Sequence, residues 1–232
     1  ITDITIMETV STVIPGLMQK KQFNVIDVLQ HAATWNGNVE VITNSVEGGI
    51  HRIGYAELYD RTSQLANALN RLGVKAGDRI GTMAWNTWRH LECWYGLSGI
   101  GAICHTLNPR LFPDQIEYIV NHAQNRFIFI DTSFVPVIAN VLDKLPLLEG
   151  LIVMTDEEHM TDDMRELGIP VYCYEELLAT EGSDFVWPLF SADTASSLCY
   201  TSGTTGNPKG VLYSHRSNLN HAMVTAHGDM FD

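Results

Sequence analysis

The sequence has few positive charges for its length. Its 232 residues include 14 lysines and arginines but 27 aspartates and glutamates, which gives a formal net charge of −13 at pH 7. Nucleic acids and anionic membranes are bound through clustered Lys and Arg side chains, so this balance argues against both as partners. An anionic ligand would have to be held by a local arrangement of hydrogen-bond donors.

The sequence also lacks cysteine pairs with the spacing of a metal site. None of its four cysteines forms a C-x-x-C motif with another; they are Cys93, Cys104, Cys173 and Cys199. In a chain of this size we expect them to be reduced and mostly buried, which is typical of a cytoplasmic protein. A disulfide among them stays an open alternative, and we predict no metal site.

Long hydrophobic runs are absent as well. Residues 1–19 include Asp3 and Glu8 and lack the basic start of a secretory signal. The longest nearly apolar stretch, residues 93–104, is interrupted by Gly and Ser and is shorter than the ~18 residues that span a bilayer. We therefore predict no transmembrane segment. Because the first residue is Ile rather than Met, we expect the sequence to be part of a longer translation product.

What the sequence does contain is the pattern of a folded α/β protein, with 45% hydrophobic and 18% charged residues. Helical and strand patterns alternate, which predicts partly parallel sheets with helices packed on their faces. Strands are expected at 39–43, 79–84, 127–130 and 151–154, and helices after Asn24, at Ala56, after Asn86, at Pro113 and over 134–145. We expect an N-terminal extension at 1–20, a first α/β subdomain at 21–190, and the start of a second subdomain at 191–232.

Two segments have an unusual composition. The helix after Asn86 ends in small residues, among them Gly96 and Gly99, and we expect that end to pack closely against a neighbouring sheet. Residues 155–168 are rich in Asp and Glu, which favours an exposed loop with a short helix over the alternative of a cation site.

The most informative segment for function is residues 201–210, T-S-G-T-T-G-N-P-K-G, which combines glycines, hydroxyl residues and a lysine. It lies between two segments that we expect to be strands. Gly203, Gly206 and Gly210 would allow positive φ angles and a close approach of the backbone to a ligand. Successive N–H groups can then form an anion-binding nest, to which the hydroxyls add donors and Lys209 adds one positive charge. Pro208 would limit the entropy lost on binding. The segment therefore predicts a polyphosphate site.

Two other interpretations of this segment are weaker. A flexible linker rarely places Pro-Lys-Gly directly before a β-branched apolar strand. The phosphate loop of P-loop NTPases requires G-x-x-x-x-G-K-[ST] followed by a helix, whereas here Asn207 and Pro208 separate Gly206 from Lys209 and a strand is expected to follow.

Y-T-S-G-T-T-G-N-P-K-G, residues 200–210, resembles the phosphate-loop motif of AMP-forming, adenylate-forming enzymes. The resemblance extends upstream through Tyr55–Leu58, Gly77–Arg79 and Gly101–Arg110, and so covers nearly the whole chain. The sequence around Trp85-Asn86, Asn108–Arg110 and Tyr213–Arg216 most resembles that of medium- or long-chain fatty acyl-CoA ligases. The resemblance implies the N-terminal portion of the acyl-CoA synthetase-like fold, truncated.

It also implies a two-step reaction with ATP, Mg²⁺ and coenzyme A, in which a fatty acid or another carboxylic acid becomes an acyl-adenylate and then a thioester. By resemblance, the β- and γ-phosphates would be held, and the leaving pyrophosphate aligned, by Thr201, Ser202, Gly203, Thr204, Thr205, Gly206 and Lys209. Thr201 and Lys209 would be the catalytic members. The family's adenine, ribose and Mg²⁺ sites and its C-terminal lysine lie further downstream, so we expect this fragment to be inactive alone.

Two alternatives to an acyl-CoA ligase stay open. They are a peptide-synthetase adenylation domain and a non-catalytic binding module of the same fold. Acyl chain length and oligomeric state are also open, since a truncated sheet edge could pair with a second copy.

Other candidate residues carry weaker signals. His215, His221 and His227 are spaced by six and do not share one helical face as metal ligands would. We interpret His215 as a strand-end residue near the loop. Trp85, Trp88 and Trp94 indicate core rather than an acyl tunnel, and Asn108–Arg110 indicates a structural turn, although Arg110 could line a cleft.

Overall fold

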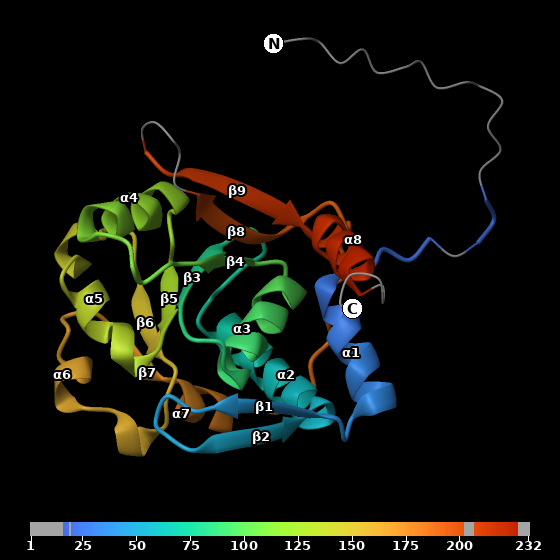
Figure 1. Ribbon diagram of the computed structural model, residues 1–232, viewed down its shortest axis with the longest axis horizontal. Helices are drawn as coiled ribbons and strands as arrows, with labels where there is room; N and C mark the ends of the chain where they lie inside the picture. Colours follow the sequence, from blue (N-terminus) through green and yellow to red (C-terminus); the bar gives the residue numbers. More distant parts are fainter. Residues whose placement is uncertain (1–15, 19, 202–206, 227–232) are drawn as a thin grey trace, which may run out of the picture.

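The computed structural model describes residues 16–18, 20–201 and 207–226 (Figure 1). It is an α/β protein in which a mostly parallel sheet lies between helices, as predicted. Most of the predicted extension 1–20 and five residues of the predicted phosphate loop lie outside this part of the chain.

The main sheet has seven strands in the order β7-β6-β5-β3-β4-β8-β9, and every pairing is parallel except β8–β9. A separate antiparallel hairpin consists of β1 (Glu40–Asn44) and β2 (Ile50–Gly54). The strands of the sheet are β3 (Arg79–Met83), β4 (Ile103–Thr106), β5 (Phe127–Ile130), β6 (Gly150–Val153), β7 (Val171–Cys173), β8 (Ala195–Thr201) and β9 (Lys209–Ser214).

Helices connect the parallel strands and cover both faces of the sheet. They are α1 (Val25–Asn36), α2 (Tyr55–Arg71), α3 (Trp88–Gly99), α4 (Pro113–Ala123), α5 (Val135–Ala139), α6 (Asp162–Arg165), α7 (Tyr174–Ala179) and α8 (His215–Thr225). Among the described residues, no helix combines the length and the apolar character needed to cross a bilayer.

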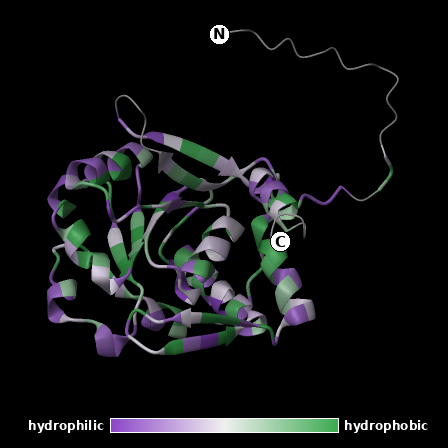
Figure 2. Cartoon of the chain, viewed as in Figure 1, coloured by the Kyte–Doolittle hydropathy of each residue, from purple (hydrophilic) through white to green (hydrophobic). Residues whose placement is uncertain are grey.

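Two hydrophobic clusters, one on each face, hold the sheet and helices together. Phe127 and Phe129 of β5 belong to the cluster with α2, α3 and α7, whereas Ile128 and Ile130 belong to the cluster with α4 and α5. Side chains alternate along a strand, so β5 is buried on both sides, as its continuous apolar run predicts. Figure 2 shows the same pattern, with hydrophobic stretches along the inner strands and hydrophilic residues on outer helical turns.

Several predicted helix boundaries are correct because they depend on local signals. Asn24 is the N-cap of α1, and its backbone N–H donates to the Asp27 carboxylate at 2.8 Å. Pro113 lies in the first turn of α4. Gly73 has a φ of +77° just beyond the end of α2, where a residue with a side chain would be strained.

Two helix predictions are wrong in detail. Thr87, not Asn86, is the N-cap of α3, and its side chain accepts from the His90 N–H. The helix expected at 134–145 is broken into α5 and the short 3-10 turns Thr132–Phe134 and Leu142–Lys144. Proline accounts for the two ends, because Pro136 is tolerated only in a first helical turn and Pro146 moves Leu145 out of the helical region. The interruption at Asn140–Val141 contains no proline.

The small end of α3 packs only partly as predicted. A Cβ on Gly96 would lie 3.1 Å from Leu65 of α2, and a Cβ on Gly99 would lie 2.4 Å from the Trp187 ring. The close neighbours at these two glycines are therefore α2 and the connector at 183–194, whereas the Ser98 hydroxyl between them donates to the Ser196 carbonyl of β8 at 3.3 Å, which is the predicted contact with the sheet. That connector leads to β8, which is parallel to β4 in the same sheet as the strands before residue 190. The subdomain boundary at 190 stays a prediction.

Candidate phosphate-binding site

The β8–β9 hairpin places the ends of the predicted phosphate loop together. Thr201 and Lys209 are register partners at the last pair of the ladder, and both are exposed. Because β8 is parallel to β4, Thr201 lies at the carboxyl edge of the sheet, where open α/β proteins bind ligands. The rest of the predicted set lies outside the described residues, namely Ser202, Gly203, Thr204, Thr205 and Gly206.

Gly210 has a different function from the one predicted. It is a β9 residue without positive φ, paired with Tyr200 of β8. A Cβ at this position would lie 3.2 Å from both the Tyr200 Cζ and the Leu198 Cδ1. The absent side chain therefore makes room for the Tyr200 ring instead of permitting an unusual backbone angle.

His215 faces away from the loop. It is the first residue of α8, is fully buried, and its Nδ1 accepts from the Val25 N–H at 3.0 Å. Burial lowers the pKa of His215 to about 4, so the imidazole is neutral near pH 7. Its contacts join the start of α8 to the start of α1 and indicate a packing role.

The other predicted candidates are structural. The Arg110 N–H donates to the Asn108 side chain at 3.0 Å, which makes the expected turn. Trp88 is buried against the His51 ring, with centroids 3.7 Å apart, and Trp94 packs against the core. Trp85 is an exception to the predicted core placement, since it is 48% exposed.

A buried ionic network was not predicted. The Arg61 guanidinium bonds the Glu92 and Glu175 carboxylates, and Arg89 bonds Glu175 and Glu47. Burial opposes the charged form of Arg61, but its carboxylate contacts outweigh burial and raise the pKa of Arg61. These partners are 31 to 114 residues apart, so no local sequence signal could have revealed them. The network joins α2, α3, α7 and the β1–β2 turn.

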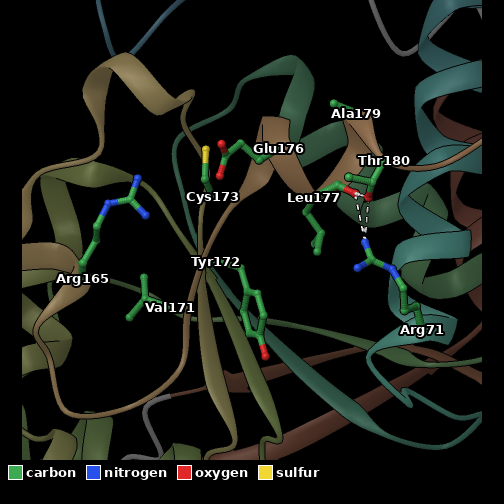
Figure 3. Close-up of a pocket in the computed structure, with 9 residues that line it drawn as sticks. All are labelled: Arg71, Arg165, Val171, Tyr172, Cys173, Glu176, Leu177, Ala179 and Thr180. Carbon is green, nitrogen blue, oxygen red and sulfur yellow. Dashed lines mark hydrogen bonds between the residues drawn. The ribbon is translucent and has the colours of Figure 1, made fainter.

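A cavity of about 480 Å³ lies beside β7 and α7 (Figure 3), and neither Thr201 nor Lys209 lines it. Two arginines on its wall already have partners. The Arg71 Nη2 donates to the Thr180 hydroxyl at 2.8 Å, and Arg165 pairs with Glu157. The cavity therefore presents no free arginine for an anionic ligand.

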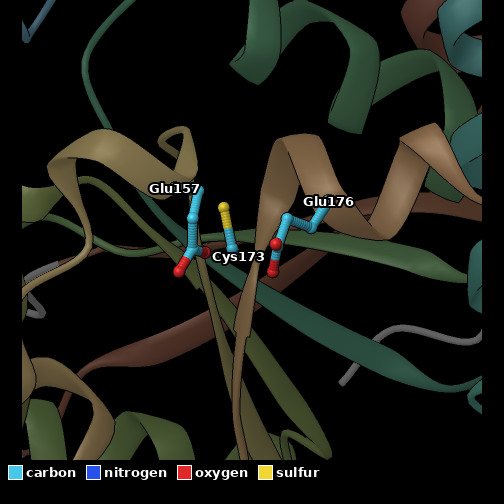
Figure 4. A group of neighbouring side chains, drawn as sticks. All are labelled: Glu157, Cys173 and Glu176. Carbon is cyan, nitrogen blue, oxygen red and sulfur yellow. The ribbon is translucent and has the colours of Figure 1, made fainter.

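Within the described ranges, one group of side chains has the residue types and the close spacing of a metal site. The ligand atoms of Glu157, Cys173 and Glu176 lie within 4.8 Å of one another (Figure 4). Glu157 already pairs with Arg165, and burial raises the pKa of the Cys173 thiol, which disfavours the thiolate that binds metal. We assign no metal to this group, of which only Glu157 belongs to the acidic segment 155–168.

Comparisons with known proteins agree with the motif. The family model described as AMP-binding enzyme matches residues 29–231. The chain is 43% identical over 211 residues to a 3-methylmercaptopropionyl-CoA ligase of Ruegeria lacuscaerulensis and 41% identical over 214 residues to a medium-chain-fatty-acid–CoA ligase of Ectopseudomonas oleovorans. It is 36% identical over 212 residues to a long-chain-fatty-acid–CoA ligase of Thermus thermophilus. These matches cover 90–92% of this chain but only 37–39% of the relatives.

Solved structures share the fold. An anthranilate CoA ligase in complex with anthranoyl-AMP superposes with a TM-score of 0.75 at 22% identity, covering 85% of this chain and 36% of that one. A fatty acyl CoA synthetase of Mycobacterium tuberculosis gives a TM-score of 0.67 at 22% identity, covering 83% and 34%. The family model spans residues 29–231, well over half of the sequence, and shows that the chain belongs to the AMP-binding enzyme family.

Proposed function

We propose that this chain supplies the phosphate loop of an AMP-forming acyl-CoA ligase that acts on a fatty acid. The observation that carries the proposal is the β8–β9 hairpin, in which Thr201 pairs with Lys209 on the carboxyl edge of the sheet. The motif between these residues, together with relatives named as CoA ligases, supports the reaction type.

A carboxylate is a poor electrophile, so the reaction requires activation. The acid attacks the α-phosphate of ATP, forming an acyl-adenylate and releasing pyrophosphate, and the thiol of coenzyme A then displaces AMP. In our proposal the main-chain amides and hydroxyls of 201–206 hold the β- and γ-phosphates, Lys209 offsets their charge, and Mg²⁺ enters with the nucleotide. These groups stabilise the charge that develops on the leaving pyrophosphate.

The charge distribution makes Lys209 the central residue of this proposal. The chain carries an excess of 13 negative charges, which repels a polyphosphate. Charge-assisted hydrogen bonds contribute about 1.5–3 kcal/mol each, so a few of them at one loop can outweigh a modest long-range repulsion. Lys209 is exposed, and as a neighbour of Thr201 across the hairpin it can reach a ligand in the loop.

The first prediction concerns Lys209→Ala in the protein encoded by the whole reading frame. Removal of one electrostatic contact at a reacting centre typically costs ~10²–10³ in rate, so ATP–pyrophosphate exchange should fall by that factor. Lys75→Ala is the matched control, because Lys75 is an exposed lysine next to β3 at the opposite, amino edge of the sheet. Exchange by Lys209→Ala equal to that of Lys75→Ala would refute the proposal.

The acid substrate needs a separate test. The relatives' names span medium-chain and long-chain fatty acids and 3-methylmercaptopropionate, so chain length is not settled by likeness. Exchange measured with carboxylic acids of graded length would identify the preferred acid. A preference for amino acids would favour a peptide-synthetase adenylation domain instead.

We further propose that the 232 residues alone are inactive and that the complete enzyme acts in the cytoplasm. The chain covers 37–39% of its relatives' length, and their remaining residues would have to supply the other sites. All four cysteines are free, which suits a reducing compartment. Thioester formation by the 232 residues with ATP and coenzyme A would contradict the first part.

A further inference from the structure

Tyr200 connects the phosphate-loop hairpin to a helix far away in sequence. It precedes Thr201 on β8, and its ring covers the Gly210 backbone on β9. Its hydroxyl is hydrogen-bonded to His122 Nδ1 at 2.6 Å. One side chain thus contacts the strand before the loop, the strand after it and α4.

His122 offers a firm attachment point. It lies in the last turn of α4, whose inner residues Ile116, Ile119 and Val120 are buried in the core. The Tyr118 ring stacks on the imidazole, with centroids 5.3 Å apart and an angle of 24° between the ring planes. The Tyr200 ring meets His122 edge-on, at 5.8 Å and 89°. Stacking on one side and the Tyr200 contact on the other fix the imidazole.

The hairpin has little other support at this end. Among the described strands, β9 pairs only with β8, and its Val211, Leu212 and Tyr213 are 37–60% exposed. Thr201 and Lys209 are themselves exposed and make no side-chain hydrogen bond within the described part of the chain. The pairing of β8 with β4 ends at Cys199, so among the described strands the pairs at Tyr200 and Thr201 have only β9 beside them. Two strands by themselves are marginally stable, so a contact to a helix whose inner face is buried in the core matters here.

We propose that Tyr200, tethered by His122, is a positioning residue that holds Thr201 and Lys209 in the geometry that binds the terminal phosphates of ATP. The inference rests on the proposed function and adds a specific pair of side chains to it. Neither residue touches the nucleotide in this account. Without the tether the hairpin ends sample more arrangements, and ATP must order them when it binds.

The test uses ATP–pyrophosphate exchange by the protein encoded by the whole reading frame, with the acid that the wild type prefers. Tyr200→Phe removes only the hydroxyl, and His122→Ala removes its partner. A typical hydrogen bond corresponds to about a fivefold effect, so each variant should raise the KM for ATP about fivefold while the KM for the acid stays unchanged. The double variant should be no worse than either single one, because both remove the same contact.

Two further variants separate positioning from general damage. Tyr213→Phe is the matched control, since Tyr213 lies on β9 and its hydroxyl has no hydrogen-bond partner among the described residues. It should leave the KM for ATP unchanged. His122→Asn, whose amide oxygen can take the place of Nδ1, should recover part of the loss seen in His122→Ala.

The outcomes distinguish this inference from the proposed function. If the wild type exchanges with an acid and Lys209→Ala is slow, but Tyr200→Phe and His122→Ala match the wild type, the inference is wrong and the proposed function stands. Equal increases in the KM for ATP and for the acid would also overturn it, because the effect would not be specific to the phosphate loop; a lower kcat with both KM values unchanged would do so too, because it indicates loss of folded protein. If the wild type shows no exchange with any acid, both fail.

Discussion

Glu92 offers the sharpest test of what stabilises the fold. Its carboxylate is fully buried on α3, where it accepts from the Arg61 Nε at 2.6 Å and from the Tyr174 hydroxyl at 2.6 Å. Glu92→Met keeps the side-chain volume but removes both acceptors. Among the described residues, Arg61 then keeps only the Glu175 carboxylate as a partner, at 2.9 and 3.0 Å, and the buried Tyr174 hydroxyl has lost its acceptor.

Breaking a buried ion pair by removing one partner typically costs 3–5 kcal/mol, and we expect about 4 kcal/mol here. For a chain of this size that corresponds to a decrease in Tm of about 8–16 °C. Equilibrium urea unfolding and thermal unfolding of the 232-residue chain would measure both quantities. Glu158→Ala serves as the control, since Glu158 is exposed and should change stability by less than about 0.5 kcal/mol.

A second variant tests the cause of the loss. In Arg61→Met/Glu92→Met no buried charge of the pair is left without its partner, so the double variant should be more stable than Glu92→Met alone. A loss below about 1 kcal/mol for Glu92→Met, or a double variant less stable than the single one, would refute the reasoning.

Two further predictions concern a histidine and a glycine. The pKa of buried His215, about 4, lies below its unfolded value of about 6.5, so its contribution to the free energy of unfolding is complete above pH 6.5 and is lost as the pH falls towards 4. Acidification from pH 7 to 5 should therefore cost about 2 kcal/mol more in the wild type than in His215→Asn, as measured by urea unfolding at both pH values. An equal loss in both proteins would contradict the buried neutral imidazole. Gly99→Ala places a Cβ 2.4 Å from the Trp187 ring and should cost about 1–3 kcal/mol and alter tryptophan fluorescence, whereas Gly182→Ala, with open space around it, should change little; unaltered stability of Gly99→Ala would show that Trp187 is not packed there.

The parts of the fold that the sequence predicts are those specified by neighbouring residues. The continuous run at 127–130 predicts a strand buried on both faces, and Pro113 marks the start of a helix, because each signal acts over a few positions. The error at 134–145 has the same origin. Apolar spacing favoured one helix there, whereas Pro136 and Pro146 act at single positions and limit where helical structure begins and ends, and no proline marks the interruption after Ala139.

Contacts between distant segments could not be predicted in this way. The Arg61–Glu175 pair spans 114 residues and the Tyr200–His122 pair spans 78. Each requires knowledge of strand order, because only the placement of β7 and β8 in the sheet brings the partners together. The phosphate-loop motif was visible as a continuous string of residues, but the tether that we propose for it was not.

Strand order also shows that the fold by itself would predict a ligand site at a different strand end from the one that carries the phosphate loop. After β3 the chain adds β4 on one side and then returns to place β5 on the other, so the topological switch point lies between β3 and β5. Ligands of open α/β sheets commonly bind outside the strand ends at such a point. Here the segments that follow the two strands are joined directly, since the backbone N–H of Trp85 donates to the buried Asp131 carboxylate at 2.6 Å. The loop with the chemistry of a polyphosphate site begins instead at Thr201, two strands away from β3, on β8. The site must therefore be inferred from its residues, because the same sheet can carry its functional loop at more than one strand end.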